Sequence, residues 1–256
     1  MFRPRVIPVL LLKGRGLVKS VQFKDYRYLG DPINAVKIFN DLRADELVLL
    51  DILATREKRM ISLDLVQEIG DEANMPFGVG GGIRSIKDIK AILNAGAEKV
   101  IINSYAFENP DFIREAADVF GSSTIVVSMD VKKKFLGKEQ VYVAGGTKST
   151  GISAVEWAQV MQAKGAGEII VNSIEQDGKM EGYDLRLIKQ VSQAVDVPVV
   201  ALGGAGNLRD LNKAVRESYA SAVAAGSLFV YHGPRRAVLV NYPGQVELLN
   251  LFDNDL

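Results

Sequence analysis

A glycine-rich turn between an apolar strand and a polar helix start occurs twice in this chain, and this repeat constrains the fold most. The first copy follows Pro76 and occupies residues 77–84 (FGVGGGIR). The second copy follows Pro198, 122 residues further on, and occupies residues 199–207 (VVALGGAGN). Glycine lets backbone N–H groups approach an anion closely, and a helix start favours negative charge. The pair indicates a duplicated scaffold that binds a ligand with a phosphate at each end, although two ordinary strand-to-helix turns would look the same.

The same offset recurs outside the glycine turns. Residues 44–48 (ADELV) match 166–170 (AGEII), and residues 85–89 (SIKDI) match 207–211 (NLRDL). Two half-barrels of four βα units each explain this repeat. Residues 5–13 align with 124–132 at an offset of 119, which pairs Leu11 with Asp130. Both positions would point to the C-terminal rim, where catalytic residues of barrels gather, but only Asp130 is a carboxylate. Its structural alternative is a rim aspartate that caps a loop.

Apolar runs of strand length alternate with amphipathic stretches of helix length. Most runs are apolar throughout, as expected of parallel strands buried on both faces. This alternation over 256 residues predicts an α/β fold, a (β/α)8 TIM barrel built from two duplicated half-barrels, with a doubly wound open sheet as the alternative. We expect strands at 6–12, 46–51, 77–79, 99–103, 124–129, 168–172, 197–202 and 220–225. We expect helices at 32–42, 62–72, 86–95, 111–120, 154–164, 185–194 and 208–217.

Local sequence adds caps and domain organisation to this prediction. Asp31-Pro32, Asn109-Pro110 and Asn207-Leu208 resemble helix caps followed by a first turn. No composition break marks a linker, so we expect a single barrel domain over residues 1–256, with an atypical C-terminal tail over 230–256.

Composition argues against several classes of function. Lys and Arg together number 31, as do Asp and Glu, so the net charge of zero argues against a nucleic-acid or acidic-membrane binder. The chain has no cysteine and one histidine, His232, so we expect no disulfide, no metal site and no cofactor. No apolar run reaches the roughly 18 residues of a membrane span, and the first residues lack a signal-peptide cleavage site. We therefore expect a cytoplasmic protein.

Several long motifs give the chain a specific resemblance. They are 30–32 (GDP), 44–52 (ADELVLLDI), 79–85 (VGGGIRS), 99–104 (KVIINS), 177–178 (DG), 182–184 (GYD) and 203–208 (GGAGNL). From residue 3 to about residue 229 the chain resembles the cyclase subunit of imidazole glycerol phosphate synthase. The resemblance implies a barrel that forms imidazole glycerol phosphate and AICAR from PRFAR and ammonia in histidine biosynthesis. It also implies a heterodimer with a glutaminase subunit, which docks on the N-terminal face and sends ammonia through the barrel interior.

The resemblance also assigns roles to individual residues. It makes Asp130 one of two catalytic aspartates and Glu98 a residue of the glutaminase interface. It places one phosphate of a phosphorylated small-molecule ligand at Gly82, Asn103 and Ser104. It places the other phosphate at Asp177, Gly178, Gly204, Gly226 and Ser227. Asp51 matches a pocket carboxylate, and Lys19 matches a lysine of the mobile first loop. The gate of the ammonia channel is matched by Arg5, Glu46, Lys99 and Glu168.

The chain departs from the family pattern at several positions. Leu11 replaces the second catalytic aspartate, Leu202 replaces a small hydroxyl residue, and Asn172 replaces a threonine. In the tail, residues 230–243 replace the usual last helix; Pro234 can start a helix there, which Pro243 would end early. This tail and the first strand, with leucine at residues 10–12, resemble a branch associated with bacterial surface polysaccharides such as lipopolysaccharide. Its cyclase-like members supply ammonia to a sugar amidotransferase that places an acetamidino group. His232 is either catalytic or, as is more common beside Gly-Pro, a loop residue.

Three functions remain open on these grounds. The first is an ammonia-conducting barrel used for acetamidino modification of a sugar. The second is a working cyclase in which Asp130 alone carries the proton transfers, and the third is a non-enzymatic scaffold that activates the glutaminase.

Overall fold

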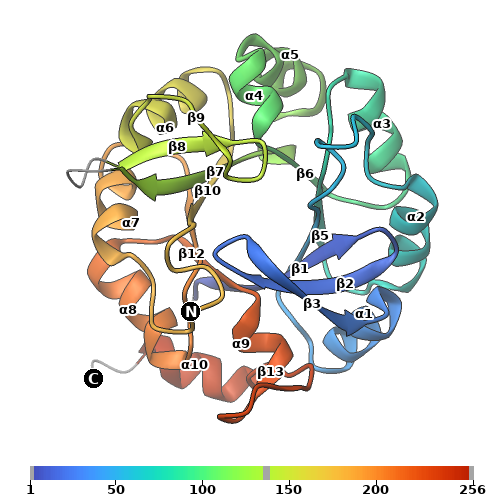
Figure 1. The fold of residues 1–256 in the computed structure, drawn as a ribbon, viewed down its shortest axis with the longest axis vertical. Coiled ribbons are helices and arrows are strands. Elements are labelled where there is room, and N and C mark those ends of the chain that lie inside the picture. The colour runs from blue at the N-terminus through green and yellow to red at the C-terminus, as the bar shows by residue number, and fades with distance from the viewer. Residues whose placement is uncertain (1–2, 135–138, 254–256) are drawn as a thin grey trace.

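The computed structural model describes residues 3–134 and 139–253, and within them eight parallel strands close into a barrel with helices outside (Figure 1). Each strand pairs with two neighbours, and β12 returns to β1, so the barrel has no free edge. The predicted (β/α)8 barrel is confirmed, and the open-sheet alternative is wrong. The barrel strands, in order around the ring, are β1 Arg5–Lys13, β4 Leu47–Asp51, β5 Phe77–Gly80, β6 Lys99–Ile102, β7 Ile125–Lys133, β10 Glu168–Ser173, β11 Val199–Leu202 and β12 Ala222–Ala225.

Helices that follow the strands cover the outside of the barrel. Asp31 caps the first of them through the N–H of Asn34, and Asn207 caps α8, as the sequence predicts. The third predicted cap is wrong, because Pro110 is the N-cap of α5 and no side chain caps that helix. The helices are α1 Pro32–Asp41, α2 Leu63–Glu72, α3 Ile86–Asn94, α4 Ser104–Glu108, α5 Asp111–Phe120, α6 Ala154–Ala163, α7 Leu185–Ser192, α8 Leu208–Ser218, α9 Ser227–Val230 and α10 Gln245–Asp253, with a 3-10 turn, η1, at Ser122–Thr124.

The apolar side chains form two layers, because successive residues of a strand point to opposite faces. On β1, Leu10 and Leu12 pack outward against the helices, whereas Ile7 and Val9 point into the barrel. Leu11 packs against the inner layer from its upper end. Strands that bury both faces explain why the runs in the sequence are apolar throughout rather than alternating.

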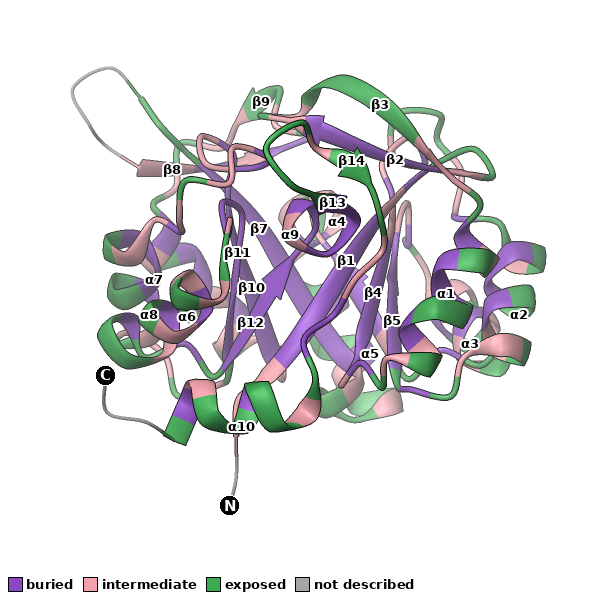
Figure 2. Cartoon of the chain, turned by 90° about the horizontal axis from the view of Figure 1, so that it is seen from below, coloured by how far each residue is buried: buried purple, intermediate pink, exposed green. Residues whose placement is uncertain are grey.

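Each half of the barrel carries an antiparallel excursion after its first strand, which the sequence analysis did not anticipate. In the first half this is β2 Gly16–Val21 with β3 Lys24–Gly30, and in the second half β8 Glu139–Val143 with β9 Lys148–Ser149. Strand β7 runs on to Lys133, beyond its predicted end, because its last residues pair with β8. Figure 2 shows both excursions over the C-terminal end of the barrel, opposite α10. The shared placement agrees with a duplicated half-barrel.

The tail differs from the prediction of a helix between Pro234 and Pro243. Residues 231–238 form a small hairpin, in which β13 Tyr231–His232 pairs with β14 Ala237–Val238. The turn uses left-handed backbone at Gly233 (φ 70°) and Arg236 (φ 50°), which a helix would not allow. The last helix, α10, begins after Pro243 instead of ending there.

A polar cluster joins the tail to the N-terminal end of the barrel. The buried hydroxyl of Tyr242 donates to the carbonyl of Val6 at 2.9 Å and lies 3.3 Å from the backbone nitrogen of Asp45, which donates to it. Arg3 forms an ion pair with the Asp45 carboxylate at 2.6 Å and also contacts Gln245 of α10. These contacts hold the starts of β1 and α10 together. No helix within the described ranges is long and apolar enough to cross a membrane.

Tyr242→Phe is expected to lower the free energy of unfolding by about 1–3 kcal/mol, because it leaves buried polar backbone groups without the hydroxyl. Urea unfolding should show a lower midpoint with an unchanged slope. Tyr219→Phe is the matched control, since the Tyr219 side chain is 55% exposed, and it should change stability by less than about 0.5 kcal/mol. Identical midpoints for the two variants would contradict a stabilising role for the Tyr242 hydroxyl.

Candidate functional site

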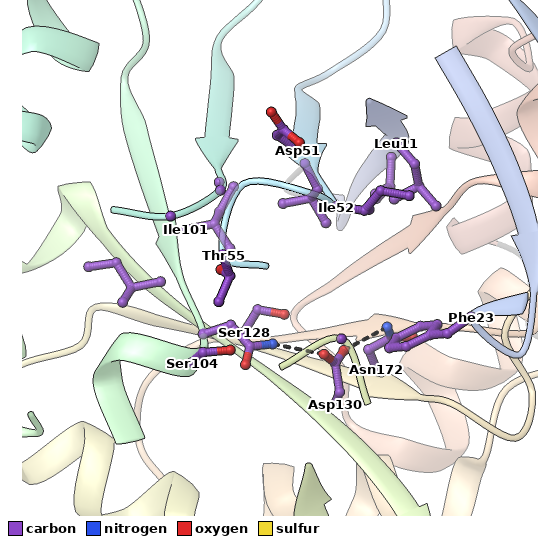
Figure 3. Close-up of a pocket in the computed structure, with 18 of the residues that line it drawn as sticks. Leu11, Phe23, Asp51, Ile52, Thr55, Ile101, Ser104, Ser128, Asp130 and Asn172 are labelled. Carbon is purple, nitrogen blue, oxygen red and sulfur yellow. Dashed lines mark hydrogen bonds between the residues drawn. The ribbon is translucent and has the colours of Figure 1, made fainter. Parts of the chain in front are cut away.

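A cavity of about 1160 Å³, which includes space open to solvent, lies at the C-terminal end of the barrel. It is lined by strand ends, the first glycine turn and the β2–β3 excursion (Figure 3). A smaller hollow beside it is lined by the second glycine turn and the start of α9. Together these two spaces are lined by every rim residue that the resemblance assigned: Lys19, Asp51, Gly82, Asn103, Ser104, Asp130, Asp177, Gly178, Gly204, Gly226 and Ser227.

Asp130 lies in the wall of the main cavity, held by two amide groups (Figure 3). Its two carboxylate oxygens accept from Asn103 Nδ2 at 2.9 Å and from Asn172 Nδ2 at 3.0 Å. Burial raises the pKa of Asp130 from 3.8 to about 6, and the two amide donors oppose this shift. A carboxyl group with such a pKa can exchange protons near neutral pH. Leu11 lines the same cavity, so the position equivalent to Asp130 in the repeat offers no second acid or base.

Two other carboxylates line the cavity, and each has a cationic partner. Asp51 accepts a hydrogen bond from Arg59 at 2.6 Å. No pattern in the sequence indicated a role for Arg59. Asp177 accepts from Lys19 at 3.2 Å, and both side chains are more than nine-tenths buried. Lys19 lies in strand β2, within the connection between β1 and α1 to which the resemblance assigned it, and forms an ion pair there. Asp130 differs from these two carboxylates, because no lysine or arginine among residues 3–134 and 139–253 forms an ion pair with it.

Both glycine turns require glycine because backbone packs against them. Gly82 has a φ of 67°, and a Cβ there would lie 1.9 Å from the carbonyl oxygen of Arg59. Gly204 has a φ of 118°, and a Cβ there would lie 2.1 Å from the carbonyl oxygen of Gly182. The turns thus place the starts of α3 and α8 at the rim, in backbone contact that a residue with a Cβ would prevent.

The helices that follow the glycine turns already bind carboxylates of their own. Asp88 accepts from two backbone N–H groups at the start of α3, and Asp210 does so at the start of α8. The short helices α4 and α9 have no side-chain cap, and the Ser227 hydroxyl is buried without a hydrogen-bond partner in the described part of the chain. The backbone without a side-chain cap at the rim is therefore that of α4 and α9, which begin at Ser104 and Ser227, two residues that the resemblance assigned to the phosphate sites.

Four charged side chains meet at the N-terminal end of the barrel. Lys99 Nζ lies 3.0 Å from Glu46 and 2.9 Å from Glu168, and Arg5 contacts the same two carboxylates. Burial acts to lower the pKa of Arg5, but the two glutamates outweigh it and the net shift is upward. The charges balance within the cluster, as partly buried ions require. Glu98, beside Lys99, is exposed at the same end.

Apolar side chains fill the barrel between this cluster and the cavity. A small space directly above the charges is lined by Glu46, Lys99 and Glu168 on one side and by branched aliphatic residues on the other. The inner layer contains Ile7, Val9, Val48, Ile101, Val126, Ile170, Val200, Leu202, Ala222 and Ala224, with Leu11 and Leu50 packed against it.

His232, the remaining candidate residue from the sequence, lies outside both the rim and the charged cluster. His232 is exposed on β13 and does not line either rim space, so its alternative as a loop-type surface residue fits the structure. No group of three or more potential metal ligands occurs in the residues that the structure describes.

Comparison with protein families matches residues 5–234 to the family described as "Histidine biosynthesis protein". The chain belongs to this family. It is 48% identical over 243 residues to the "Putative imidazole glycerol phosphate synthase subunit hisF2" of Pseudomonas aeruginosa, covering 95% of this chain and 97% of that protein. It is 45% identical over 253 residues to the similarly named HisF of Leptospira interrogans, covering 98% and 100%. It is also 45% identical over 232 residues to the "Imidazole glycerol phosphate synthase subunit HisF" of Alkaliphilus metalliredigens, covering 91% and 92%.

Family membership agrees with the resemblance read from the motifs. It supports a barrel related to synthase subunits, and hence an enzymatic complex, while the printed names give no acceptor and no role for position 11.

Asp130→Asn is expected to stabilise the protein increasingly as the pH rises from about 4 to 7. The folded protein binds the Asp130 proton more tightly than the unfolded chain, so the wild type loses stability as pH rises from its ordinary pKa through about 6. The free energy of unfolding of both proteins, measured by denaturant titration at several pH values, tests this. Asp118→Asn, which removes an exposed carboxylate on α5, is the control. A constant difference between Asp130→Asn and wild type over this range would rule out a raised pKa.

Proposed function

We propose that this protein is an ammonia-conducting barrel that works with a glutaminase subunit docked on its N-terminal face. The observation that carries the proposal is the charged cluster of Arg5, Glu46, Lys99 and Glu168 directly below an apolar shaft. A structural ion network would not need a space above it that leads into an aliphatic interior. Neutral ammonia can cross such an interior, whereas ions are disfavoured there by the loss of hydration.

The charged cluster serves as the gate in this proposal. Arg5 and Lys99 each contact both glutamates, so movement of either cation would open a polar passage while the other keeps the carboxylates paired. Exposed Glu98 at the same end would contact the glutaminase subunit. The relatives' names describe them as subunits, which supports a complex of this kind.

The rim cavity would receive the ammonia together with a phosphorylated small molecule. One phosphate would lie at Gly82, Asn103 and Ser104, near the uncapped start of α4. The other would lie at Gly204, Gly226 and Ser227, where the Ser227 hydroxyl lacks a partner among the described residues. Lys19 and Asp177 lie between the two positions, and the lysine offers positive charge to either phosphate.

The acceptor of the ammonia is proposed to be a sugar that a separate amidotransferase modifies with an acetamidino group, in surface-polysaccharide synthesis. The support is the lining of the cavity that contains Asp130, in which Leu11 and Leu202 are apolar and the remaining carboxylates, Asp51 and Asp177, are paired with cations. Ring closure would need acid and base groups on opposite walls, and one wall is aliphatic.

An active cyclase of histidine biosynthesis is the second candidate. Asp130 favours it, because its pKa of about 6 would let one carboxyl group act as acid and base in turn. The relative from Alkaliphilus metalliredigens is named as a synthase subunit without qualification, which also favours it. A scaffold that only activates the glutaminase is a third candidate, and an apolar shaft would have no role in it.

Lys99→Ala is expected to uncouple glutamine hydrolysis from product formation, because it opens the gate to solvent. The assay would contain the complex with the glutaminase, the acceptor and its amidotransferase. Glutamine labelled with ¹⁵N at the amide would be added in a buffer of unlabelled ammonium salt. The ¹⁵N content of the aminated product should remain high for the wild type and fall severalfold for Lys99→Ala, as leaked ammonia mixes with the buffer.

Lys90→Ala, an exposed lysine of α3, is the matched control and should keep the label. Full retention of label by both Lys99→Ala and Glu46→Ala would show that ammonia does not pass the charged cluster.

Leu11→Asp distinguishes the two candidate functions, delivery of ammonia for sugar modification and the cyclase reaction. The wild type with PRFAR and ammonium salt is expected to show very weak or no formation of imidazole glycerol phosphate, since a missing acid or base costs about 10²–10⁴-fold in rate. Leu11→Asp should restore part of this turnover, because position 11 lines the same cavity as Asp130.

Leu50→Asp, which places a carboxylate in the same cavity on the neighbouring strand, should restore nothing. The measurement is steady-state turnover of PRFAR. Robust activity of the unmutated protein would contradict the proposal of sugar modification and support a role in histidine biosynthesis.

A further inference from the structure

Three segments that are far apart in the sequence meet beside the mouth of the cavity. We call residues 16–30, which form β2 and β3, the cover, residues 174–179 the seat, and residues 231–238, which form the β13–β14 hairpin, the strap. The cover and the seat contribute lining residues to the cavity, whereas the strap contributes none. The strap overlaps, from Pro234 to Val238, the part of the tail for which the sequence predicts a helix.

The cover is bound to the seat by backbone and side chains. The N–H of Gln22 donates to the carbonyl of Asp177 at 2.9 Å, and Gln22 Nε2 donates to the carbonyl of Glu175 at 2.9 Å. Lys19 of the cover pairs with the Asp177 carboxylate. A Cβ at Gly178 would lie 2.2 Å from the carbonyl oxygen of Ser20, so the two segments are in direct backbone contact. The ion pair of Lys19 and Asp177 therefore depends on the seat staying in place.

The strap holds the seat from the other side. Arg236 donates to the carbonyl of Gly178 at 3.2 Å through Nη1 and to the carbonyl of Lys179 at 2.9 Å through Nη2. These are the two residues that follow Asp177. Guanidinium is suited to this contact because its fixed, planar donors can bind two carbonyl groups at once, which the ammonium of lysine does less well.

The strap also contacts the cover. Arg27 of β3 donates to the carbonyl of Arg236 at 3.3 Å, and its guanidinium lies 5.7 Å from the centre of the Tyr231 ring. Each of the three segments thus contacts the other two. Strand β2 pairs with β1 at the base of the cover, whereas β3 pairs with β2 alone. The outer part of the cover, around Gln22 and β3, therefore depends on the contacts with the seat and the strap.

We propose that the strap fixes the cover in its closed position over the cavity, with Arg236 as the positioning residue that holds the Asp177 loop against Lys19. Entry to the cavity and the placement of this ion pair then depend on the C-terminal tail. The inference goes beyond the ammonia-channel proposal, because it holds for any ligand of the cavity and needs neither a glutaminase nor an acceptor.

Hydrogen–deuterium exchange of the full-length protein without ligand tests the strap. Arg236→Ala should speed exchange at the Gln22 amide, and in peptides from the cover and the seat, by at least about tenfold, since the free energy of local opening governs local exchange. Strands β5 and β6 should exchange as in the wild type. Arg235→Ala is the matched control, because Arg235 is exposed on the same turn of the hairpin, and it should leave the cover unchanged.

Acetylation of lysine amines, followed by mass spectrometry, gives a second readout. Lys19 is 6% exposed and should react slowly in the wild type and in Arg235→Ala but severalfold faster in Arg236→Ala. Exposed Lys24 on the same hairpin should react equally in all three proteins. Arg236→Lys, which keeps the charge but not the two-pronged contact, should be intermediate in both assays.

Equal exchange of the cover and equal acetylation of Lys19 in Arg236→Ala and Arg235→Ala would overturn the proposal. If Arg236→Ala exchanges fast throughout the barrel, Arg236→Lys and Arg27→Gln decide instead. Faster exchange confined to the cover and seat in these two variants supports the strap, and wild-type exchange in both overturns it.

Discussion

Closure of the parallel sheet determines which side chains meet inside this protein. A closed barrel turns one face of every strand inward, and successive inward positions are two residues apart. The inward positions are Lys99 and Ile101 of β6, followed by Asn103 just after the strand, and Glu168, Ile170 and then Asn172 of β10. Strands β6 and β10 flank β7 on its two sides, and the same three-level order on both contributes to the charged floor, the aliphatic shaft and the polar rim.

Buried charges are compensated differently at the two ends of the shaft. At the floor, two cations and two carboxylates compensate one another, which is the arrangement that makes ions tolerable away from water. At the rim, the described part of the chain gives Asp130 two neutral amide hydrogen bonds and no cation, and burial therefore moves its pKa toward neutrality. The floor is suited to a stable polar seal, and the rim to a group that changes protonation state.

Family membership defines the scaffold more firmly than the reaction. The relatives cover almost the whole chain, and the barrel shows how a shaft and a rim cavity are built. The chemistry depends on a few side chains at the rim, where a position that faces a cavity is less constrained by packing than a position in the core. Leu11 is such a position: it lines the cavity as an aliphatic side chain, and its backbone pairs in register with Val18 of β2 and Leu50 of β4.

The sequence by itself determined the barrel, most strand and helix positions and the caps at Asp31 and Asn207, because these follow from local periodicity, cap chemistry and the 122-residue repeat. Its motifs also indicated the family, with the residues now found at the floor and the rim. It could not give the partners of Asp51, the amide pair around Asp130, or the carboxylates that already occupy the starts of α3 and α8. The tail was misread for a related reason, since Pro234 and Pro243 are compatible with a helix between them or with a hairpin followed by one. Tertiary structure decided these points, because contacts such as Arg236 with Gly178 and Tyr242 with Val6 join residues 58 and 236 positions apart, and no local pattern records them.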